Sequence, residues 1–463
     1  MCLPERAPDG DDDSKPGRRP RPGYGAGMTQ PTAADEVVDL CRDLIRIDTT
    51  NDGTGRAVPG ERQAAELVAH WLAEVGLEPE VVESAPGRAS VVARMEGTDP
   101  TRPALLVHGH LDVVPAEPKE WTYDPFAGEI ADGCLWGRGA VDMKDMDAMA
   151  LAVVRERLRS GRRPPRDVVL AFLADEEAGG TWGAGWLVEH RPELFEGVTE
   201  AISEVGGFSL TVSDDVRLYM IETAQKGMAW MRLTATGRSG HGSMVSDDNA
   251  VTRLCEAVAR LGRHTFPVHV TPTVRAFLGE VGDAFGIELD PDDMEATVAR
   301  LGPLARIVGA TLRNTANPTM LDAGYKHNVI PGRASAMVDG RFLPGFEAEF
   351  EQELDEVLGA DVVREWVHHD IALETTFDGA LVEAMSASLR AEDPGARPVP
   401  YMLSGGTDNK HFSRLGIRGF GFAPLRLPPD LDFAGMFHGV DERVPLESLQ
   451  FGTRVLDRFL DLA

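Results

Sequence analysis

Six acidic and histidine residues lie where apolar runs of this 463-residue chain end. The runs are ALLVHGHLD (104–112), GRGAVDMKD (137–145), VVLAFLADEE (168–177) and AISEVGG (201–207), and FHGVDER (437–443) follows much later. A buried strand that ends in a carboxylate or an imidazole places a costly polar group at the edge of a sheet, which is typical of chemistry rather than of stability. Two histidines and several carboxylates suit a zinc-type site, with more carboxylates than one metal ion needs. The six residues are His110, Asp142, Glu176, Glu177, Glu204 and His438.

The first run offers two histidines, His108 and His110, which point to the same face of a strand, and Asp112 shares that face. We interpret His110 as a metal ligand and Asp112 as the carboxylate that accepts its second ring N–H and fixes its tautomer. The simpler alternative is a turn with two hydrogen-bonded histidines. For Asp142, which precedes an apolar helix, the simpler alternative is a helix N-cap. At a strand-to-helix junction, however, its two oxygens could bridge two cations.

Glu176 and Glu177 follow an apolar strand, and adjacent side chains leave a strand on opposite sides. We therefore expect one to bind metal and the other to face the substrate as a general base. Nearby cations would relieve their mutual repulsion; the alternative is an exposed glutamate pair at the start of a helix. Glu204 is followed by two glycines, which allow close backbone approach. His438 taken alone is an ordinary surface histidine.

Apolar strands alternate with amphipathic helices over the first part of the chain, which predicts an α/β sheet with helices on both faces. Helices are predicted at 33–47, 61–77, 146–161 and 182–190, and strands at 78–84, 90–97, 103–110, 167–177 and 201–207.

The pattern changes after about residue 227. A strand at 226–237, a helix at 246–262, a mostly helical stretch at about 266–317, two strands around Pro331 and Gly332, and a helix at 346–359 read as a small α+β domain in strand–helix–strand–strand–helix–strand order. The α/β pattern resumes at about residue 372, so the second domain is inserted into the first. This insertion is needed for His438 to rejoin the other candidate residues. The predicted parts are a disordered tail at 1–30, a catalytic domain at 31–227 and 371–463, and the inserted domain at 228–370.

Composition narrows the classes of function. The formal net charge of −29 argues against nucleic acid and anionic membranes as partners. No apolar stretch approaches the roughly 20 residues that span a bilayer. The polar N-terminal stretch lacks the apolar core of a secretory signal and is expected to be disordered. The four cysteines have no metal-like spacing, which predicts reduced thiols in the cytoplasm.

Together the motifs HGHLDVVP, GRGAVDMK and DEE resemble the M20 family of zinc-dependent peptidases and aminoacylases, from about residue 33 to the end of the chain. The resemblance implies an α/β zinc-exopeptidase-like domain with a mixed sheet and an inserted ferredoxin-like α+β lid and dimerisation domain. It implies two zinc ions, with cobalt or manganese as alternatives. His110 and Glu204 would bind one ion, Glu177 and His438 the other, and Asp142 would bridge them. Glu176 would be the general base, and a cis peptide would follow Asp142.

The resemblance extends to the inserted domain and beyond. GRSGHGSMVSDDNAV resembles the lid motif whose histidine stabilises the oxyanion, often from a partner subunit, which points to His241; Val245 stands where a proline is usual. Asn328 and Arg341 would bind the carboxylate end of the substrate, a task that a guanidinium performs bidentately. For Arg341 a domain-interface ion pair is the alternative. SGGTDNKHF resembles a substrate loop, with Gly406 and Thr407 as the contacts.

The implied activity is hydrolysis of an amide bond in small peptides or N-acyl amino acids that carry a free carboxylate, by a homodimer paired through the inserted domain. A dipeptidase or aminopeptidase of the same family is an alternative. An inactive binding protein on this fold would need a lost ligand or base, and none is lost. A redox or nucleotide enzyme is disfavoured because the chain lacks a strand-borne GxGxxG motif and a P-loop.

Overall fold

The computed structural model describes residues 30–54, 60–288, 290, 294–300 and 304–463. The predicted disordered tail at 1–30 lies outside these residues except for residue 30. Among the described residues, no helix combines the length and the apolar character that crossing a bilayer requires.

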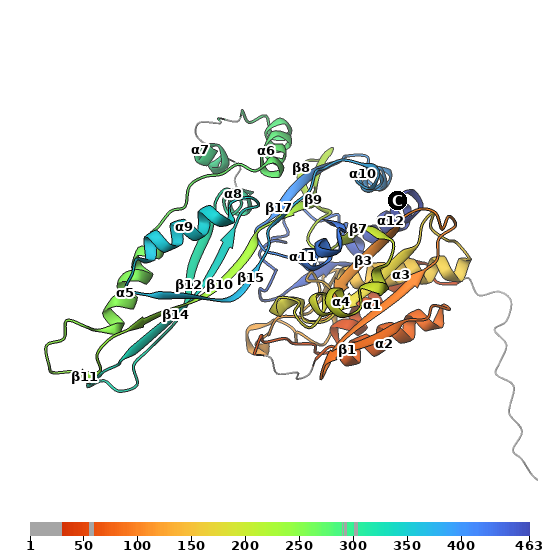
Figure 1. Cartoon of the computed structure of the whole chain (residues 1–463). Coiled ribbons are helices and arrows are strands. Elements are labelled where there is room, and N and C mark those ends of the chain that lie inside the picture. The colour runs from red at the N-terminus through yellow and green to blue at the C-terminus, as the bar shows by residue number, and fades with distance from the viewer. Residues whose placement is uncertain (1–29, 55–59, 289, 291–293, 301–303) are drawn as a thin grey trace, which may run out of the picture.

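A ten-stranded mixed sheet dominates the molecule (Figure 1). Its strands are β1 (Glu80–Ala85), β2 (Arg88–Met95), β3 (Ala104–His110), β6 (Val168–Leu173), β7 (Val198–Ser203), β8 (Phe208–Ser213), β9 (Val216–Gln225), β16 (Leu373–Glu374), β17 (Ala396–Leu403) and β18 (Arg418–Gly421). The order is β1-β2-β6-β3-β7-β18-β9-β16, and β8 and β17 pair with β9 outside this path. β6, β3, β7 and β18 are parallel neighbours. The carboxyl ends of these four strands therefore meet at one edge of the sheet.

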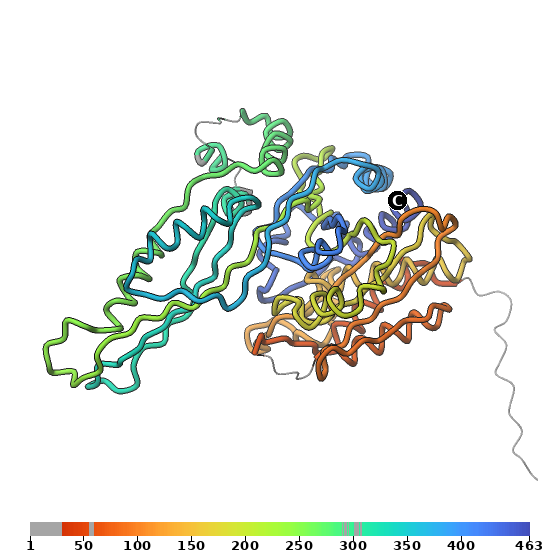
Figure 2. Tube along the Cα trace, viewed as in Figure 1, coloured from red at the N-terminus to blue at the C-terminus, as the bar shows by residue number. Residues whose placement is uncertain are grey.

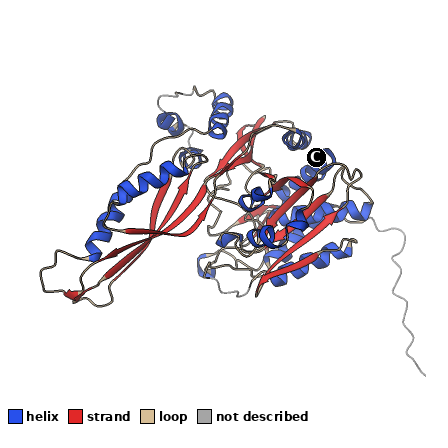
Figure 3. Cartoon of the chain, viewed as in Figure 1, coloured by secondary structure: helices blue, strands red, loops and turns tan. Residues whose placement is uncertain are grey.

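Helices cover both faces of this sheet (Figure 3). Alternation along β3 explains why, since Leu105 and Val107 face one apolar cluster and Ala104 and Leu106 face another. The first cluster is covered by α1 (Ala33–Ile45), α2 (Arg62–Glu74), α3 (Lys144–Ser160), α10 (Ala380–Glu392) and α12 (Leu446–Leu462). The second is covered by α4 (Ala184–His190) and α11 (Asn409–Phe412).

A second, four-stranded antiparallel sheet, called here the lid sheet, extends to one side (Figure 1). Its strands are β10 (Gly227–Thr236), β12 (Thr315–Ala323), β14 (Arg333–Phe342) and β15 (Val363–Asp370), in the order β12-β14-β10-β15. Helices α5 (Ala250–Leu261) and α9 (Glu347–Leu358) pack on one face of it. This arrangement follows the predicted strand–helix–strand–strand–helix–strand order. At its tip, β11 (Gly240–His241) pairs with β13 (Val329–Ile330).

The connection between the two sheets is short. β9 of the large sheet is followed after Lys226 by β10 of the lid sheet, and β15 returns to β16, which pairs with β9. Figure 2 shows the chain crossing between the two parts along these neighbouring paths. After this return, β17 and β18 complete the large sheet.

One part of the predicted inserted segment packs elsewhere. Helix α6 (Pro272–Phe285) lies against β9 and β17 of the large sheet, and Val274, Phe277 and Leu278 belong to the core of that sheet. The short helices α7 (Met294–Ala299) and α8 (Leu304–Gly309) follow it. A small sheet of β4 (Glu129–Ala131), β5 (Cys134–Trp136) and β19 (Arg443–Pro445) holds the chain just after His438 beside the chain that leads into GRGAVD.

Candidate metal centre

His110 is the last residue of β3, and its buried imidazole lies between a backbone carbonyl and two carboxylates. Nδ1 lies 2.9 Å from the backbone oxygen of Asp112. Nε2 lies 3.2 Å from Oδ1 of Asp142 and 3.5 Å from Oε2 of Glu204. A proton on Nδ1 that is donated to the carbonyl leaves the lone pair of Nε2 free to bind a cation.

The carboxylate of Asp112 has a different role from the predicted one, which was to accept the second ring N–H of His110. The nearest acceptor for the ring of His110 is the Asp112 carbonyl, and Oδ1 lies 3.5 Å from Nδ1. Instead, Oδ1 accepts the backbone N–H of Glu176 and Oδ2 that of Glu177, both at 3.1 Å. Asp112 therefore orients His110 through its backbone. Through its side chain it holds the turn that contains Glu176 and Glu177, called here the glutamate loop.

Asp142 is placed between two histidines. Its Oδ1 lies 3.2 Å from Nε2 of His110, and its Oδ2 lies 3.3 Å from Nε2 of His438. The helix that follows has Met143 as its N-cap and no side-chain capping bond, so the capping alternative for Asp142 is wrong. The expected cis peptide between Asp142 and Met143 is present.

Glu176 and Glu177 do not belong to a strand, so the alternation argument for them is wrong. β6 ends at Leu173, and the two glutamates open a single 3-10 turn, Glu176–Ala178, after Asp175 in the left-handed region at φ 68°. Their side chains nevertheless diverge, because Glu177 pairs with His438 at 3.2 Å while Glu176 lies towards His110. The turn, rather than the pleat of a strand, separates them.

Glu204 and His438 complete the cluster from opposite ends of the chain. Glu204 comes directly after β7, where the parallel strands end. His438 lies in a loop with a left-handed backbone, at φ 57°, and its side chain is partly exposed. Asp142 therefore lies between the two histidines. His110 contacts one oxygen of Asp142 and lies 3.5 Å from Glu204, and His438 contacts the other oxygen and lies 3.2 Å from Glu177. Among the described residues, the ligand atoms that lie within 4.8 Å of one another form two groups that share His110: His110 with Glu176 and Glu204, and His110 with Asp142 and Glu177.

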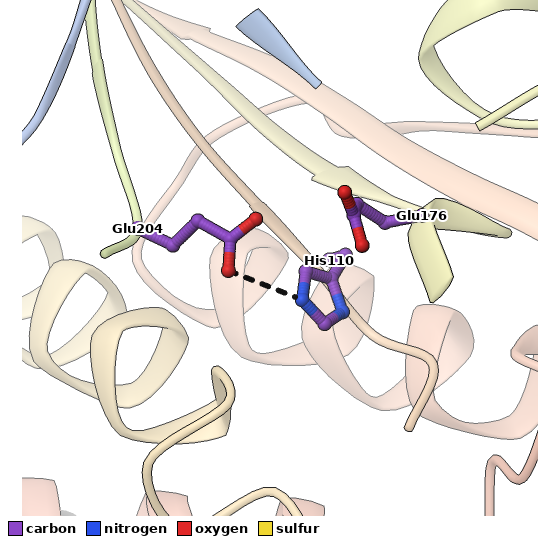
Figure 4. Close-up of side chains that lie close together, drawn as sticks. All are labelled: His110, Glu176 and Glu204. Atoms are coloured by element: carbon purple, nitrogen blue, oxygen red, sulfur yellow. Dashed lines mark ion pairs between the residues drawn. The ribbon is translucent and has the colours of Figure 1, made fainter. Parts of the chain in front are cut away.

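Glu176 is the remaining acidic side chain. Figure 4 shows it beside His110, opposite Glu204. One oxygen of Glu176 lies within 4.8 Å of ligand atoms of both residues. Among the described residues it forms no ion pair with either histidine of the centre. Its position suits a group that acts beside the cations rather than one that belongs only to the ligand set.

The pKa values show how strongly these groups need positive charge. Burial raises the pKa of Glu177 to about 7, and it also raises the pKa of Glu176 and, further, that of Glu204. Hydrogen bonds to Asp142 and Glu177 raise the pKa of His438 to about 10. Divalent cations in the cluster would favour ionised carboxylates and neutral imidazoles.

The donor set fits such cations. Imidazole nitrogens and carboxylate oxygens are the ligands that zinc takes in catalytic sites. Oε1 of Glu177 is buried and has no hydrogen-bond partner among the described residues, so it is available to a cation. A catalytic zinc ion takes three protein ligands and a water molecule or substrate atom in the fourth position.

His108 lies on the same strand but takes no part in the centre. Its Nε2 lies 3.0 Å from Oδ1 of Asn409, its ring packs on Phe412, and burial lowers its pKa to about 4. It belongs to none of the clusters of candidate ligands found among the described residues. The simpler alternative, a buried and hydrogen-bonded histidine, therefore describes His108.

Sequence reasoning missed the residues that support the ligands. Glu442 is fully buried; its Oε1 accepts the backbone N–H groups of Val141 and Asp142 at 2.7 and 3.2 Å, and its Oε2 pairs with Arg138 at 2.7 Å. Asn51 donates to Asp112 from an equally buried position. Arg138 and Glu442 lie in two of the segments that the sequence singles out, GRGAVDMKD and FHGVDER, but nothing in either segment indicates that the two residues pair.

The structure does not bring the predicted lid residues to the centre within one chain. His241 is exposed on β11, at the end of the lid sheet far from β3 (Figure 1). Asn328 lies beside it, because its carbonyl accepts the N–H of Gly242 at 2.9 Å. Arg341, farther along β14, pairs with Asp339 at 2.7 Å. This local ion pair differs from the domain-interface pair that was the alternative.

The predicted substrate loop lies at the base of the lid sheet. Thr407 is buried, and its N–H and hydroxyl both donate to Oε1 of Gln225, at 3.1 and 2.8 Å. Gln225 is the last residue of β9, directly before the crossing to the lid sheet. A Cβ built on Gly406 would lie 3.7 Å from the backbone oxygen of Lys226. The loop therefore lies where the chain crosses from the large sheet to the lid sheet.

Comparison with known proteins agrees with this geometry. The model of peptidase family M20/M25/M40 matches residues 106–462. Human aminoacylase-1 is 27% identical over 434 residues, which cover 91% of this chain and 94% of that protein. Residues 106–462, which the family model matches, include all the candidate ligands of the centre.

Solved structures show the same fold at low sequence identity. An M20 family metallo-carboxypeptidase from Sulfolobus solfataricus has a TM-score of 0.70 at 18% identity, covering 92% of this chain and 99% of that one. A dinuclear metal binding peptidase of the M20 family from Bacillus subtilis has a TM-score of 0.57 at 14% identity, covering 92% and 97% of the two chains. At these sequence identities the similarity shows a common fold and does not indicate the substrate.

Proposed function

Because the chain belongs to peptidase family M20/M25/M40 and is therefore a hydrolase of carbon–nitrogen bonds, we propose that it cleaves the amide bond of small peptides or N-acyl amino acids that carry a free carboxylate. The observation that carries the proposal is the position of Asp142, whose two oxygens each face one histidine, while each of these histidines also pairs with a glutamate. Two cations held by these groups would polarise the scissile carbonyl and lower the pKa of a water molecule towards about 7.

Glu176 is the proposed general base. It is buried beside the ligand set, and burial raises its pKa, which suits a group that must accept and then release a proton near neutral pH. In the proposed reaction it takes a proton from the attacking water and delivers it to the leaving nitrogen. Asp112 keeps Glu176 in place through the hydrogen bond to its backbone N–H.

Arg341 and Asn328 are the proposed partners of the substrate carboxylate, with Gly406 and Thr407 as further contacts. The register places Arg341, Met228 and Thr315 side by side on the lid sheet, on the face that the helices do not cover. Oδ1 of Asn328 is buried without a hydrogen-bond partner among the described residues, so it can still accept one. A substrate carboxylate would compete with Asp339 for the guanidinium of Arg341.

A homodimer through the lid is the proposed active form, with His241 stabilising the oxyanion of a partner subunit. Two features support it. First, β12 is an edge strand of the lid sheet and exposes Met320 and Leu321, at 67% and 61%; such an apolar edge is normally paired. Second, β11, the strand that contains His241, lies at the end of the lid sheet away from β3 in Figure 1. Closure of the lid over the substrate would then complete the site.

We propose zinc as the native metal, with cobalt or manganese as alternatives that the same ligands accept. A cytoplasmic location is proposed from the cysteines. The three that the structure describes, Cys41, Cys134 and Cys255, are free thiols, as expected in a reducing compartment.

The test is a substrate panel on metal-free protein reconstituted with zinc, cobalt or manganese. N-acetyl amino acids, dipeptides with free amines and the same dipeptides with blocked amines would be compared, each with and without the C-terminal carboxylate. Similar rates on blocked and free amines support a deacylase or carboxypeptidase, and a requirement for the free amine supports the dipeptidase or aminopeptidase alternative. The similarity to aminoacylase-1 favours N-acyl amino acids.

Glu176→Gln is the matched inactive variant in this panel. Removal of a general base lowers the rate by about 10²- to 10⁴-fold. The amide keeps the shape of the side chain, so metal content should stay at the wild-type level. Near-normal turnover of Glu176→Gln, or amide hydrolysis that survives complete removal of metal, would contradict the proposal.

A further inference from the structure

A chain of buried polar side chains lies behind the candidate metal centre and is not used by the proposed reaction. It consists of Glu61, Arg88, Asn51, Asp112 and Asp175, each at most 3% exposed. Arg88 opens β2, and Glu61 precedes α2, so the chain of contacts joins elements that carry no candidate ligand to the glutamate loop. Buried charges at such positions need partners, and the partners here are these residues themselves.

Asn51 is the central member because all of its hydrogen-bonding groups are used. Its side-chain NH₂ donates to Oδ2 of Asp112 at 2.9 Å and to Oδ1 of Asp175 at 3.1 Å. Its Oδ1 accepts from Nη2 of Arg88 at 2.9 Å and from the N–H of Gly53 at 3.2 Å. The cation on one side and the two carboxylates on the other fix the orientation of the amide, since the opposite flip would oppose donor to donor and acceptor to acceptor.

Arg88 supplies positive charge beside two buried carboxylates, Glu61 and Asp175. Its guanidinium pairs with Glu61, donates to Asn51, and lies 3.8 Å from Oδ1 of Asp175. Without it, the buried carboxylates of Glu61 and Asp175 would lose the guanidinium that faces both, whereas Asp112 would keep His110 at 3.5 Å.

The two carboxylates held in this way set the geometry of the glutamate loop. Asp112 accepts the N–H groups of Glu176 and Glu177. Asp175, the residue directly before them, has a left-handed backbone and accepts the N–H of Trp182 at 2.9 Å. Figure 4 shows Glu176 reaching from this loop towards His110. A shift of the loop would therefore move a proposed metal ligand and the proposed base together.

We propose that Asn51 and Arg88 are positioning residues of the metal centre, which act through Asp112 and Asp175 to hold Glu177 for the cation and Glu176 for the reacting water. Within the part of the chain that the structure describes, the side chains of Asn51 and Arg88 contact Glu61, Gly53, Asp112 and Asp175 and none of the candidate ligands. The effect on turnover rests on the proposed function, but the effect on metal binding does not.

The test compares zinc affinity, kcat and KM in Asn51→Leu, Arg88→Lys and a matched control. Leucine has the size of asparagine and none of its hydrogen bonds. Loss of a residue that supports ligands typically weakens metal affinity or activity by about 10- to 100-fold, so both zinc affinity and kcat should fall by this factor while KM changes little. The control is Tyr219→Phe, which removes a buried hydrogen bond of 2.8 Å to Asp393 far along β9. It should lower Tm without changing zinc affinity or kcat.

Zinc titration of the metal-free protein by calorimetry gives the deciding result. Wild-type zinc affinity and kcat in a folded Asn51→Leu protein would overturn the proposal. Should that variant fail to fold, Arg88→Lys decides, because lysine keeps the charge but offers one nitrogen where the guanidinium contacts both Glu61 and Asn51; unchanged affinity in this variant also overturns the proposal. A wild-type protein that binds zinc and cleaves no amide would refute the proposed function, and the zinc affinities would still test the present inference.

Discussion

Replacing Asp142 with asparagine tests whether one carboxylate is shared by two cations. The two oxygens of Asp142 lie 3.2 and 3.3 Å from the Nε2 atoms of His110 and His438. Asparagine keeps the shape but offers one acceptor oxygen, so one of the two cation positions would face an NH₂ group. That position would keep two protein ligands of three. Because loss of an outer partner already weakens binding by about 10- to 100-fold, loss of a direct ligand should cost one ion at least 100-fold, or about 2.7 kcal/mol.

The assay is zinc content at fixed free zinc, measured by mass spectrometry after equilibrium dialysis. Wild-type protein should hold two zinc ions per chain. Asp142→Asn should hold one zinc ion per chain over a range of free zinc concentration that spans at least two decades. Asp145→Asn, a change at a buried carboxylate in the first turn of α3, is the matched control. Burial raises the pKa of Asp145 to about 8, so its side chain is largely neutral at pH 7 and an amide imitates it. Two ions bound by Asp142→Asn with wild-type affinity would refute the bridging role.

Three further outcomes are expected. In chelated protein the raised pKa values of His438, to about 10, and Glu177, to about 7, mean that the folded state holds more protons than the unfolded state. Tm of the chelated protein should therefore fall as pH rises from about 5 to 9, while zinc affinity rises, and a flat or opposite trend in both would contradict this assignment. Arg341→Met should raise KM by about 10-fold or more for substrates with a C-terminal carboxylate but not for their amides, whereas Arg333→Met, an exposed change on the same face of β14, should leave KM unaltered. Mixing inactive Glu176→Gln and His241→Ala proteins under subunit exchange should restore about one quarter of wild-type activity if His241 acts in a partner, and none if it acts within its own chain.

The alternation of strands and helices was sufficient to predict the first half of the large sheet, because strands such as β3 and β6 are mostly apolar and are buried along their whole length. β17 was not predicted, and it contains Pro398 and Pro400, which are unusual within a strand. It pairs only with β9, and an edge strand tolerates prolines since one of its sides needs no N–H donor. The position of α6 was also missed, since an amphipathic helix does not reveal which sheet its apolar side covers.

The meeting of His110, Glu177 and Glu204 followed from strand order, because β3, β6 and β7 are parallel neighbours that end at the same edge. His438 could not be placed in this way, since its loop returns to the centre after the lid sheet and its own element is not a strand. The direction of the side chains of Glu176 and Glu177 was argued from a strand and arises from a turn. Such local geometry depends on Asp175 at positive φ, which residue type alone does not announce.

The surplus of acidic residues around the site has a physical explanation in two carboxylates that bind backbone rather than metal. Asp112 accepts the N–H groups of two consecutive residues, Glu176 and Glu177, and Glu442 accepts those of Val141 and Asp142. Each of these carboxylates is fully buried, and each has an arginine behind it. Arg138 contacts Glu442 directly, and Arg88 reaches Asp112 through Asn51.

The two supports therefore hold different parts of the cluster, Glu442 the backbone at Asp142 and Asp112 the backbone at Glu176 and Glu177. Their partners come from elements as far apart in sequence as Arg138 and Glu442. No local pattern predicts such pairs, which explains why the ligands were readable from the ends of apolar runs while the groups that fix them were not. In each case the supporting carboxylate accepts a backbone N–H group. The position of the residue that donates this N–H therefore depends on the carboxylate. Neutralising Glu442 should consequently disturb the proposed bridge at Asp142 although Glu442 itself contacts neither histidine of the centre.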